Sequence, residues 1–175
     1  MKQLITGGIR SGKSALAEHQ ALASESPVLY VATATAGDGE MAERIRRHQA
    51  RRPADWQLVE EPLDLAEVLH TSADKSPCVL IDCMSLWVSN LMHREPDGMA
   101  ERVDDFLSAL ETYPGEVVVV SNEVGLGLVP MEAMSREFCD QLGWLNQSLA
   151  QRCDRVMMAV SGLPLVLKGE PLNRD

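Results

Sequence analysis

Eight residues near the start of the chain have the types and the spacing of a phosphate-binding loop. They fit the pattern G-x-x-x-x-G-K-[ST] and are Gly7, Gly8, Ile9, Arg10, Ser11, Gly12, Lys13 and Ser14. The glycines let backbone N–H groups converge on a phosphate, and the lysine can reach the β- and γ-phosphates of a nucleotide. The Ser14 hydroxyl can bind Mg²⁺. The segment therefore predicts binding of a nucleoside triphosphate together with Mg²⁺.

The residues that flank this loop support the prediction. Leu4 and Ile5 form a short apolar strand before it, and a helix-forming segment begins at Ser14. The N-terminus of that helix would face the phosphates, where the helix dipole favours negative charge. The alternative is a glycine turn with a chance lysine, but such a match rarely lies between a strand and a helix.

A second motif, which ends in an acidic residue, lies at residues 78–82. Four apolar residues, beginning at Cys78, end in the carboxylate of Asp82. This is the form of a Walker B strand, whose aspartate holds Mg²⁺ directly or through water. Many strands end in aspartate by chance, so an ordinary strand end is the alternative interpretation.

A third segment concentrates positive charge on an acidic protein. Five of the twelve arginines lie between residues 44 and 52, and His48 lies among them. Histidine can act as an acid, a base or a covalent nucleophile. Flanking arginines would lower the pKa of His48 and keep the ring neutral, as a nucleophile requires. A solvated histidine on an exposed helix is the alternative, and spacing alone favours it.

The composition excludes several classes of protein. The chain has 175 residues, 45% of them apolar, and a formal net charge of −10, which suits one globular domain and argues against a nucleic-acid-binding surface. No apolar run approaches the roughly 18 residues that span a bilayer. The four cysteines form no C-x-x-C pair, and the N-terminus leaves no room for a signal peptide. We therefore expect a cytoplasmic protein that neither binds nucleic acid nor inserts into a membrane.

These three motifs must be held by the elements around them, which alternate between strands and helices. Apolar runs predict buried strands, and apolar residues at helical spacing predict helices. The expected strands cover 28–32, 56–60, 78–82, 117–120, 155–160 and an edge at 164–167, and the expected helices cover 40–52, 63–71, 85–93, 99–113 and 134–152. The predicted fold class is α/β: a single P-loop nucleotide-binding domain, residues 1–168, with a mostly parallel sheet and helices on both faces. Residues 169–175 form an unassigned tail.

Several blocks of the sequence together resemble the adenosylcobinamide kinase/adenosylcobinamide-phosphate guanylyltransferase family. The phosphate loop is generic, whereas the Arg/His segment and the loop N-E-V-G-x-G-x-V-P at 122–130 are much more specific. The resemblance runs from about residue 3 to residue 168. Its blocks are residues 6–14, 30–34 and 40–45, His48, Arg52-Pro53 with Trp56, Glu60, residues 80–83 and residues 122–130.

The resemblance implies an activity and a set of site residues. The family phosphorylates the aminopropanol hydroxyl of adenosylcobinamide with ATP or GTP, and then transfers GMP from GTP to that phosphate through a guanylylated histidine. That histidine corresponds to His48, and Lys13 is the second catalytic residue. The implied nucleotide contacts are the phosphate loop, Ala32, Thr33, Ala34, Gln49, Ala50, Arg51, Arg52, Glu60 and Asp82. The resemblance also implies Mg²⁺ held by Ser14 and Asp82, and a ring-like homo-oligomer such as a trimer.

Two other functions stay open on the residues alone. One is a plain P-loop kinase of another small alcohol, with the arginine-rich segment as a lid. The other is a regulatory module that binds nucleotide without turnover. A GTPase switch is poorly supported, because Asp82-Cys83-Met84-Ser85 lacks the glycine of D-x-x-G and Asn122-Glu123 lacks the lysine of N-K-x-D. Only the guanylyltransferase predicts a covalent label from GTP labelled at the α-phosphate.

Overall fold

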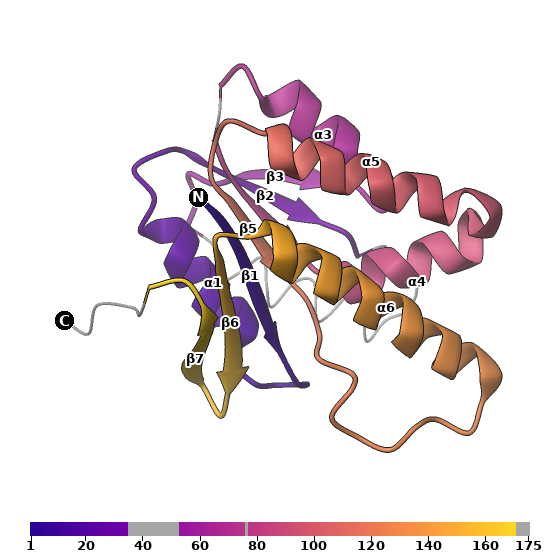
Figure 1. The fold of residues 1–175 in the computed structure, drawn as a ribbon. Coiled ribbons are helices and arrows are strands. Elements are labelled where there is room, and N and C mark those ends of the chain that lie inside the picture. The colour runs from indigo at the N-terminus through magenta and orange to yellow at the C-terminus, as the bar shows by residue number, and fades with distance from the viewer. Residues whose placement is uncertain (35–52, 76, 171–175) are drawn as a thin grey trace.

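A seven-stranded sheet forms the centre of the computed structural model, which describes residues 1–34, 53–75 and 77–170 (Figure 1). The elements are β1 (Lys2–Gly7), α1 (Lys13–Leu22), β2 (Val28–Ala32), β3 (Gln57–Glu60), α3 (Leu65–Ser72), β4 (Cys78–Asp82), α4 (Met84–Arg94), the 3₁₀ helix η1 (Pro96–Gly98), α5 (Met99–Thr112), β5 (Val117–Val120), α6 (Ala133–Arg152), β6 (Arg155–Val160) and β7 (Leu163–Lys168). The strand order is β3-β2-β4-β5-β1-β6-β7. All neighbouring strands are parallel except β6 and β7. The expected α/β fold class is therefore confirmed.

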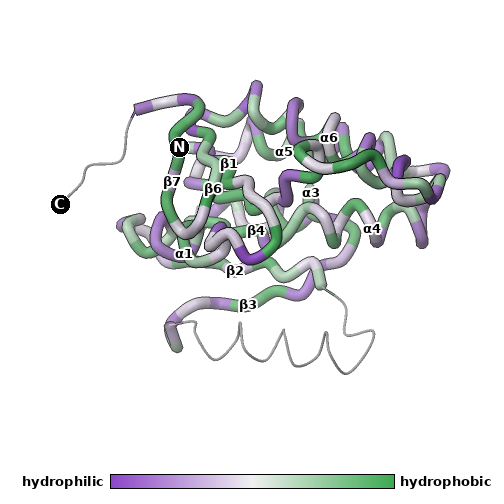
Figure 2. Tube along the Cα trace, turned by 90° about the horizontal axis from the view of Figure 1, so that it is seen from below, coloured by the Kyte–Doolittle hydropathy of each residue, from purple (hydrophilic) through white to green (hydrophobic). Residues whose placement is uncertain are grey.

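The two faces of the sheet are covered by different numbers of described helices. Ala17 and Ala21 of α1 pack with Ile5 and Leu80 on one face. On the other face, residues of α3, α4, α5 and α6 pack against strand residues that include Ile81. The inner strands are apolar on both faces, as parallel strands between helical layers should be, and Figure 2 shows this apolar character along them.

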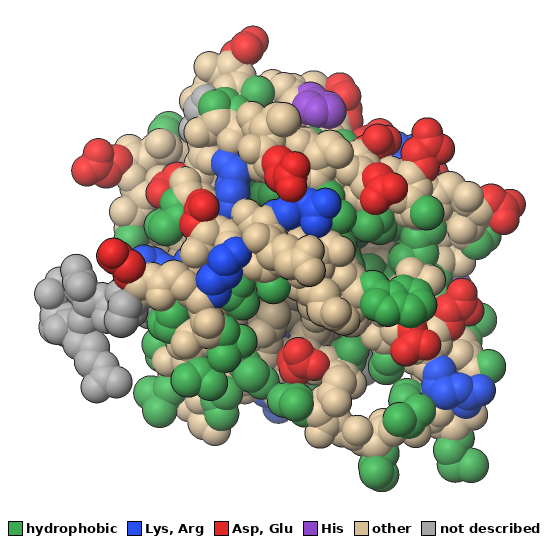
Figure 3. All heavy atoms as spheres, viewed as in Figure 1, with side chains coloured by type: hydrophobic (Ala, Val, Ile, Leu, Met, Phe, Trp, Pro, Cys, Tyr) green, Lys and Arg blue, Asp and Glu red, His purple; other side chains and the backbone are tan. Residues whose placement is uncertain are grey.

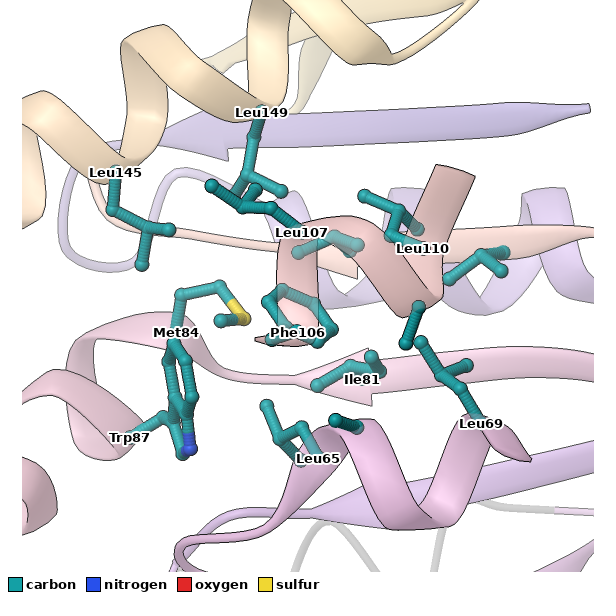
Figure 4. Close-up of a cluster of buried hydrophobic side chains, with 14 of the residues drawn as sticks. Leu65, Leu69, Ile81, Met84, Trp87, Phe106, Leu107, Leu110, Leu145 and Leu149 are labelled. Carbon is teal, nitrogen blue, oxygen red and sulfur yellow. The ribbon is translucent and has the colours of Figure 1, made fainter. Parts of the chain in front are cut away.

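Trp87 is the largest fully buried side chain among the described residues, and it packs in the cluster between the sheet and helices α3, α4, α5 and α6 (Figure 4). Its ring meets Phe106 edge-on, with centroids 5.2 Å apart and an interplanar angle of 61°. Its Nε1 donates a hydrogen bond of 2.8 Å to the carbonyl of Leu63. The buried indole therefore contributes apolar area without leaving its donor unpaired.

The observed bounds differ from the sequence predictions at element ends. Helix α6 begins at Ala133, one residue before the predicted start, because the Glu132 carboxylate accepts hydrogen bonds from the amides of Met134 and Ser135. These bonds lower the pKa of Glu132. Strand β7 covers Leu163–Lys168 rather than only 164–167. The predicted helix at 40–52 lies outside the described residues. In the part of the chain that is described, no helix is long and apolar enough to cross a membrane.

Candidate active site

The phosphate loop connects the end of β1 to the start of α1, as its motif predicts. Gly7 and Gly12 have backbone φ values of 153° and 95°, which residues other than glycine rarely adopt. A Cβ on Gly7 would lie 2.5 Å from Ser11 Oγ and 2.7 Å from the carbonyl oxygen of Ala159. Gly12 is the N-cap of α1 and has no side chain to cap it, and the first turn holds no acidic residue. The start of α1 is thus suited to an anion.

Two polar side chains of the loop fit a phosphate ligand. Lys13 is 8% exposed, and its Nζ donates a hydrogen bond of 3.2 Å to the carbonyl of Gly8, so the ammonium lies over the loop. The Ser11 hydroxyl is buried and has no hydrogen-bond partner in the described part of the chain. A buried hydroxyl without a partner is costly, by about 1–3 kcal/mol. A phosphate oxygen would accept its hydrogen bond.

The turn between β6 and β7 contacts the backbone of the phosphate loop. The Gly162 amide donates a hydrogen bond of 2.8 Å to the carbonyl of Ser11. A Cβ on Gly12 would lie only 3.0 Å from Gly162 Cα, so the two backbones touch. Sequence reasoning missed this contact, because it joins opposite ends of the chain.

The strand register brings three predicted site residues into one row. Ala32 of β2 pairs with Glu60 of β3 on one side and with Asp82 of β4 on the other. The row continues through Val120 of β5 to Ile5 of β1, shortly before the phosphate loop. The carboxyl ends of these parallel strands form one edge, which is where open α/β sheets bind ligands.

Asp82 is held in place by a tyrosine. The Tyr30 hydroxyl donates a hydrogen bond of 2.9 Å to Asp82 Oδ2. Tyr30 is 3% exposed, and its ring stacks on Trp56 with centroids 6.4 Å apart. Burial and the neighbouring Asp82 raise the pKa of the Cys83 thiol, while the positive charge of Lys13 opposes that shift. The charges of Lys13 and Asp82 thus act in opposite directions on this thiol.

Mg²⁺ fits the chemistry of these groups. It prefers carboxylate and hydroxyl oxygens, and it usually takes its remaining ligands from water and substrate phosphates. Asp82 and Ser14 offer one carboxylate and one hydroxyl at the loop's end of the sheet. No group of three or more His, Cys, Asp or Glu among the described residues could hold a metal ion by itself. A Mg²⁺ site at this edge would therefore need further ligands from the nucleotide phosphates and from water.

Thr33 connects the ends of β2 and β4. It is fully buried, its hydroxyl donates 2.8 Å to the Cys83 carbonyl, and the same oxygen accepts 2.9 Å from the Cys83 amide. Its own amide donates 3.2 Å to the carbonyl of Asp82. The Thr33 hydroxyl thus acts as both hydrogen-bond donor and hydrogen-bond acceptor within the protein. Its neighbours Ala32 and Ala34 are half-buried.

A hydrogen-bonded chain of polar residues at the same edge was not predicted. It runs through Cys83, Ser85, Asn122, Asn146 and Ser121. The loop at 122–130 was noted as a family motif, but no site residue was expected in it. The remaining expected residues, His48, Gln49, Ala50, Arg51 and Arg52, lie outside the described residues, and their roles stay predictions.

Comparison with known protein families gives a match over nearly the whole chain. The model described as cobinamide kinase/cobinamide phosphate guanyltransferase matches residues 3–167. The chain belongs to this family. It is 50% identical over 173 residues to the bifunctional adenosylcobalamin biosynthesis protein CobP of Pseudomonas aeruginosa, covering 98% of this chain and 100% of that protein. To the bifunctional adenosylcobalamin biosynthesis protein CobU of Escherichia coli it is 36% identical over 182 residues, covering 96% and 100%.

Solved structures support the fold alone. A KaiC-like protein from Pyrococcus horikoshii aligns with a TM-score of 0.50 and 11% identity, over 90% of this chain and 69% of that one. The RadB recombinase aligns with a TM-score of 0.50 and 16% identity, over 90% and 73%. The overall fold is thus shared with distant proteins.

Membership of the cobinamide kinase/cobinamide phosphate guanyltransferase family decides the class of function. The protein is a bifunctional kinase and guanylyltransferase of cobalamin biosynthesis, and its family acts on cobinamide and nucleotides. The plain kinase of another small alcohol is not favoured, because the two relatives named above are described as bifunctional and match over their full length.

Proposed function

We propose that this protein phosphorylates the aminopropanol hydroxyl of adenosylcobinamide with ATP or GTP, and then attaches GMP from GTP to the new phosphate. One observation carries the proposal: the phosphate loop and the Asp82 strand end lie at one sheet edge, in a chain that the family model matches over residues 3–167. The substrates are those that the family resemblance implies.

In the kinase step, a bond forms between the acceptor oxygen and the γ-phosphorus, and the bond to the β–γ bridging oxygen breaks. The nucleoside diphosphate leaves. Lys13 and the amides at the start of α1 bind the phosphates and offset their charge. Ser14 and Asp82 would hold Mg²⁺, which offsets charge on the β- and γ-phosphates when it is bound. Tyr30 keeps the Asp82 carboxylate in one orientation.

In the transfer step, a ring nitrogen of His48 attacks the α-phosphorus of GTP. The bond to the α–β bridging oxygen breaks, and pyrophosphate leaves. An oxygen of adenosylcobinamide phosphate then attacks the same phosphorus, and the phosphorus–nitrogen bond breaks. Gln49, Ala50, Arg51 and Arg52 are proposed to hold the nucleotide, together with Ala32, Thr33, Ala34 and Glu60.

A homo-oligomer is part of the proposal, and a trimer is the form that the family resemblance implies. Exposed apolar side chains support it, because they gather in two places (Figure 3). Leu163 on β7 is 70% exposed, and Leu128 and Met131 before α6 are both 98% exposed. Light scattering during size-exclusion chromatography should give a mass three times that of the chain, whereas a monomer mass would contradict it.

The place of action and the domain bounds are also proposals. Cys78, Cys83, Cys139 and Cys153 are all free thiols in the structure, which suits the reducing cytoplasm. We assign both activities to residues 1–168, and no role to residues 169–175.

One assay tests the proposed function. The protein is incubated with adenosylcobinamide and with GTP labelled at either the α- or the γ-phosphate. We expect the γ-label to appear first on the corrinoid, and the α-label to appear on the same corrinoid as attached GMP. Transfer of the γ-label alone would reduce the protein to a plain kinase, and transfer of neither would refute the proposal.

A further inference from the structure

Asn122 lies just beyond the end of β5, at the sheet edge between the phosphate loop and the Asp82 end of β4. It follows β5, which lies between β1 and β4. Val120 pairs with Ile5 on one side and with Asp82 on the other, so the chain leaves the sheet after Val120 between the phosphate loop and Asp82. The amide of Glu123 donates a hydrogen bond of 3.1 Å to the carbonyl of Gly7, which ties the backbone next to Asn122 to the first residue of the phosphate loop.

The surroundings of Asn122 fix its carboxamide. Its Nδ2 donates a hydrogen bond of 3.1 Å to Ser85 Oγ, at the start of α4. Its backbone carbonyl accepts 3.0 Å from Asn146 Nδ2, and Asn146 Oδ1 accepts 2.5 Å from Ser121 Oγ. Residues from β5, α4 and α6 or next to them therefore hold Asn122 in place, and the Nδ2 atom of its side chain is fixed by Ser85.

The oxygen of the Asn122 carboxamide accepts no hydrogen bond from the described residues. Asn122 Oδ1 is buried and has no hydrogen-bond partner in the part of the chain that the structure describes. Buried acceptors are nearly always paired, so an unpaired one next to a substrate site calls for a ligand that donates a hydrogen bond.

The other buried unpaired atoms sharpen this argument. Gln3 Oε1 and Arg155 Nε belong to residues that pair with each other in the β1–β6 register, far along the strands from the phosphate loop. Ser11 Oγ lies in the phosphate loop itself. Among the described residues, the buried side-chain groups without a partner at the carboxyl edge are therefore one hydroxyl, suited to a phosphate oxygen, and one acceptor, suited to an O–H donor.

We propose that Asn122 Oδ1 accepts a hydrogen bond from the acceptor hydroxyl of the corrinoid substrate and aims that hydroxyl's oxygen at the γ-phosphorus. This rests on the proposed function, because it names the alcohol that the kinase step phosphorylates. Asn122 takes no proton, since a carboxamide oxygen is not basic at neutral pH. The hydroxyl proton passes to an oxygen of the transferred phosphoryl group as the new O–P bond forms, and from there to solvent.

The proposal separates the two activities. The acceptor of the transfer step is a phosphate, which presents no alcohol hydroxyl, and formation of the guanylylated protein needs no corrinoid at all. Asn122 should therefore matter for phosphorylation of cobinamide and not for labelling of the protein by α-labelled GTP.

Asn122→Ala tests this, with nucleotide affinity, α-label incorporation and cobinamide phosphorylation measured on the same preparation. We expect kcat/KM for cobinamide to fall about tenfold, as for loss of one hydrogen bond, with nucleotide Kd and protein labelling unchanged. Asn122→Asp keeps an acceptor in the same position and should recover part of the loss. The control variant Gln3→Ala removes a distant unpaired carboxamide and should leave the kinase step near the wild-type rate.

Several outcomes would overturn the proposal. A kinase rate unchanged in Asn122→Ala would do so, as would an equal loss of nucleotide affinity or of protein labelling, which would assign Asn122 to the nucleotide. A Gln3→Ala variant as impaired as Asn122→Ala would make the effect structural. If the wild-type protein labels itself but phosphorylates no cobinamide, both the proposed substrate and this inference fail. A cobinamide-active wild type with an equally active Asn122→Ala would sink this inference alone.

Discussion

The Tyr30 hydroxyl lies 2.9 Å from Asp82 Oδ2 and donates a hydrogen bond to it across two adjacent strands. Tyr30 pairs in register with Leu80, two residues before Asp82, so both side chains lie on the same face of the sheet. Trp56 stacks on the phenol ring. Tyr30 therefore acts as a positioning residue for the carboxylate that we propose to hold Mg²⁺.

Tyr30→Phe should raise the Mg²⁺ concentration needed for half-maximal cobinamide phosphorylation by roughly tenfold, since the carboxylate loses one hydrogen bond that fixes it. The phenyl ring keeps its stacking on Trp56, so the melting temperature should stay close to that of the wild type. Initial rates measured over a Mg²⁺ series check this. Asp82→Asn should give a larger loss of rate, partly relieved by more Mg²⁺. Identical Mg²⁺ curves for Tyr30→Phe and wild type would remove the role from Tyr30.

Lys13→Ala should weaken nucleotide binding and nearly abolish both activities, because one ammonium offsets charge on the phosphates in each step. Isothermal titration with GTP and the two activity assays measure this. The control is Lys75→Ala, an exposed position in the turn after α3, which removes the same charge from another part of the surface. Full kinase activity in Lys13→Ala would refute the assignment of the phosphate loop.

Sequence reasoning recovered the elements whose signals are local. Val117–Val120 is an apolar run that must be buried on both faces, and it forms the central strand β5. Met99–Thr112 shows apolar residues at helical spacing and forms α5 within one residue of the predicted range. The phosphate loop and Asp82 could be proposed from the sequence because their chemistry fixes residue types at fixed spacings, and the structure places the loop between β1 and α1 and Asp82 at the end of β4.

The contacts that complete the site could not be found in this way. Tyr30 and Asp82 are 52 residues apart, and Asn122 and Ser85 are 37 apart. Such pairs meet only because parallel strands end at one edge, and no local pattern encodes which side chains then come within hydrogen-bond distance. The Gly162–Ser11 contact was missed for the same reason. This contact also depends on the antiparallel pairing of β6 with β7, and the spacing of apolar residues along the sequence does not predict which strands pair or in which direction.

Trp87→Phe should lower the free energy of unfolding by about 1–3 kcal/mol, because the Leu63 carbonyl loses its donor and part of the indole's buried area is lost. Urea denaturation followed by circular dichroism measures this. Trp144→Phe is the matched control, since Trp144 is 59% exposed on α6 and its replacement should change stability little. Equal effects of the two substitutions would contradict the packing described for Trp87.

Two buried thiols predict a loss of stability at alkaline pH. Burial raises the pKa of Cys78 from 9.0 to about 11 and that of Cys153 to about 12. In the unfolded chain both thiols ionise near pH 9, whereas in the folded protein they stay neutral, so the unfolded state binds fewer protons above that pH. The free energy of unfolding should therefore be constant with respect to these groups below pH 9 and fall between pH 9 and 12.

Denaturation at a series of pH values tests the role of the thiols. The double variant Cys78→Ala/Cys153→Ala should show a smaller fall in stability over that range, although it is less stable overall. Cys139→Ala keeps both buried thiols and should show the same fall as the wild type. A double variant with an undiminished slope would assign the alkaline loss to other groups.

His48 carries the central claim of the account, because a covalent guanylylated histidine separates this enzyme from a plain kinase. The test is incubation of the protein with GTP labelled at the α- or the γ-phosphate, followed by denaturing electrophoresis. We predict that only the α-label stays on the protein, that it is lost in acid and retained in alkali as a phosphorus–nitrogen bond requires, and that adenosylcobinamide phosphate removes it as attached GMP. His48→Ala should lose the label, while His19→Ala, His70→Ala and His93→Ala keep it. Labelling of His48→Ala at the wild-type rate would contradict the account.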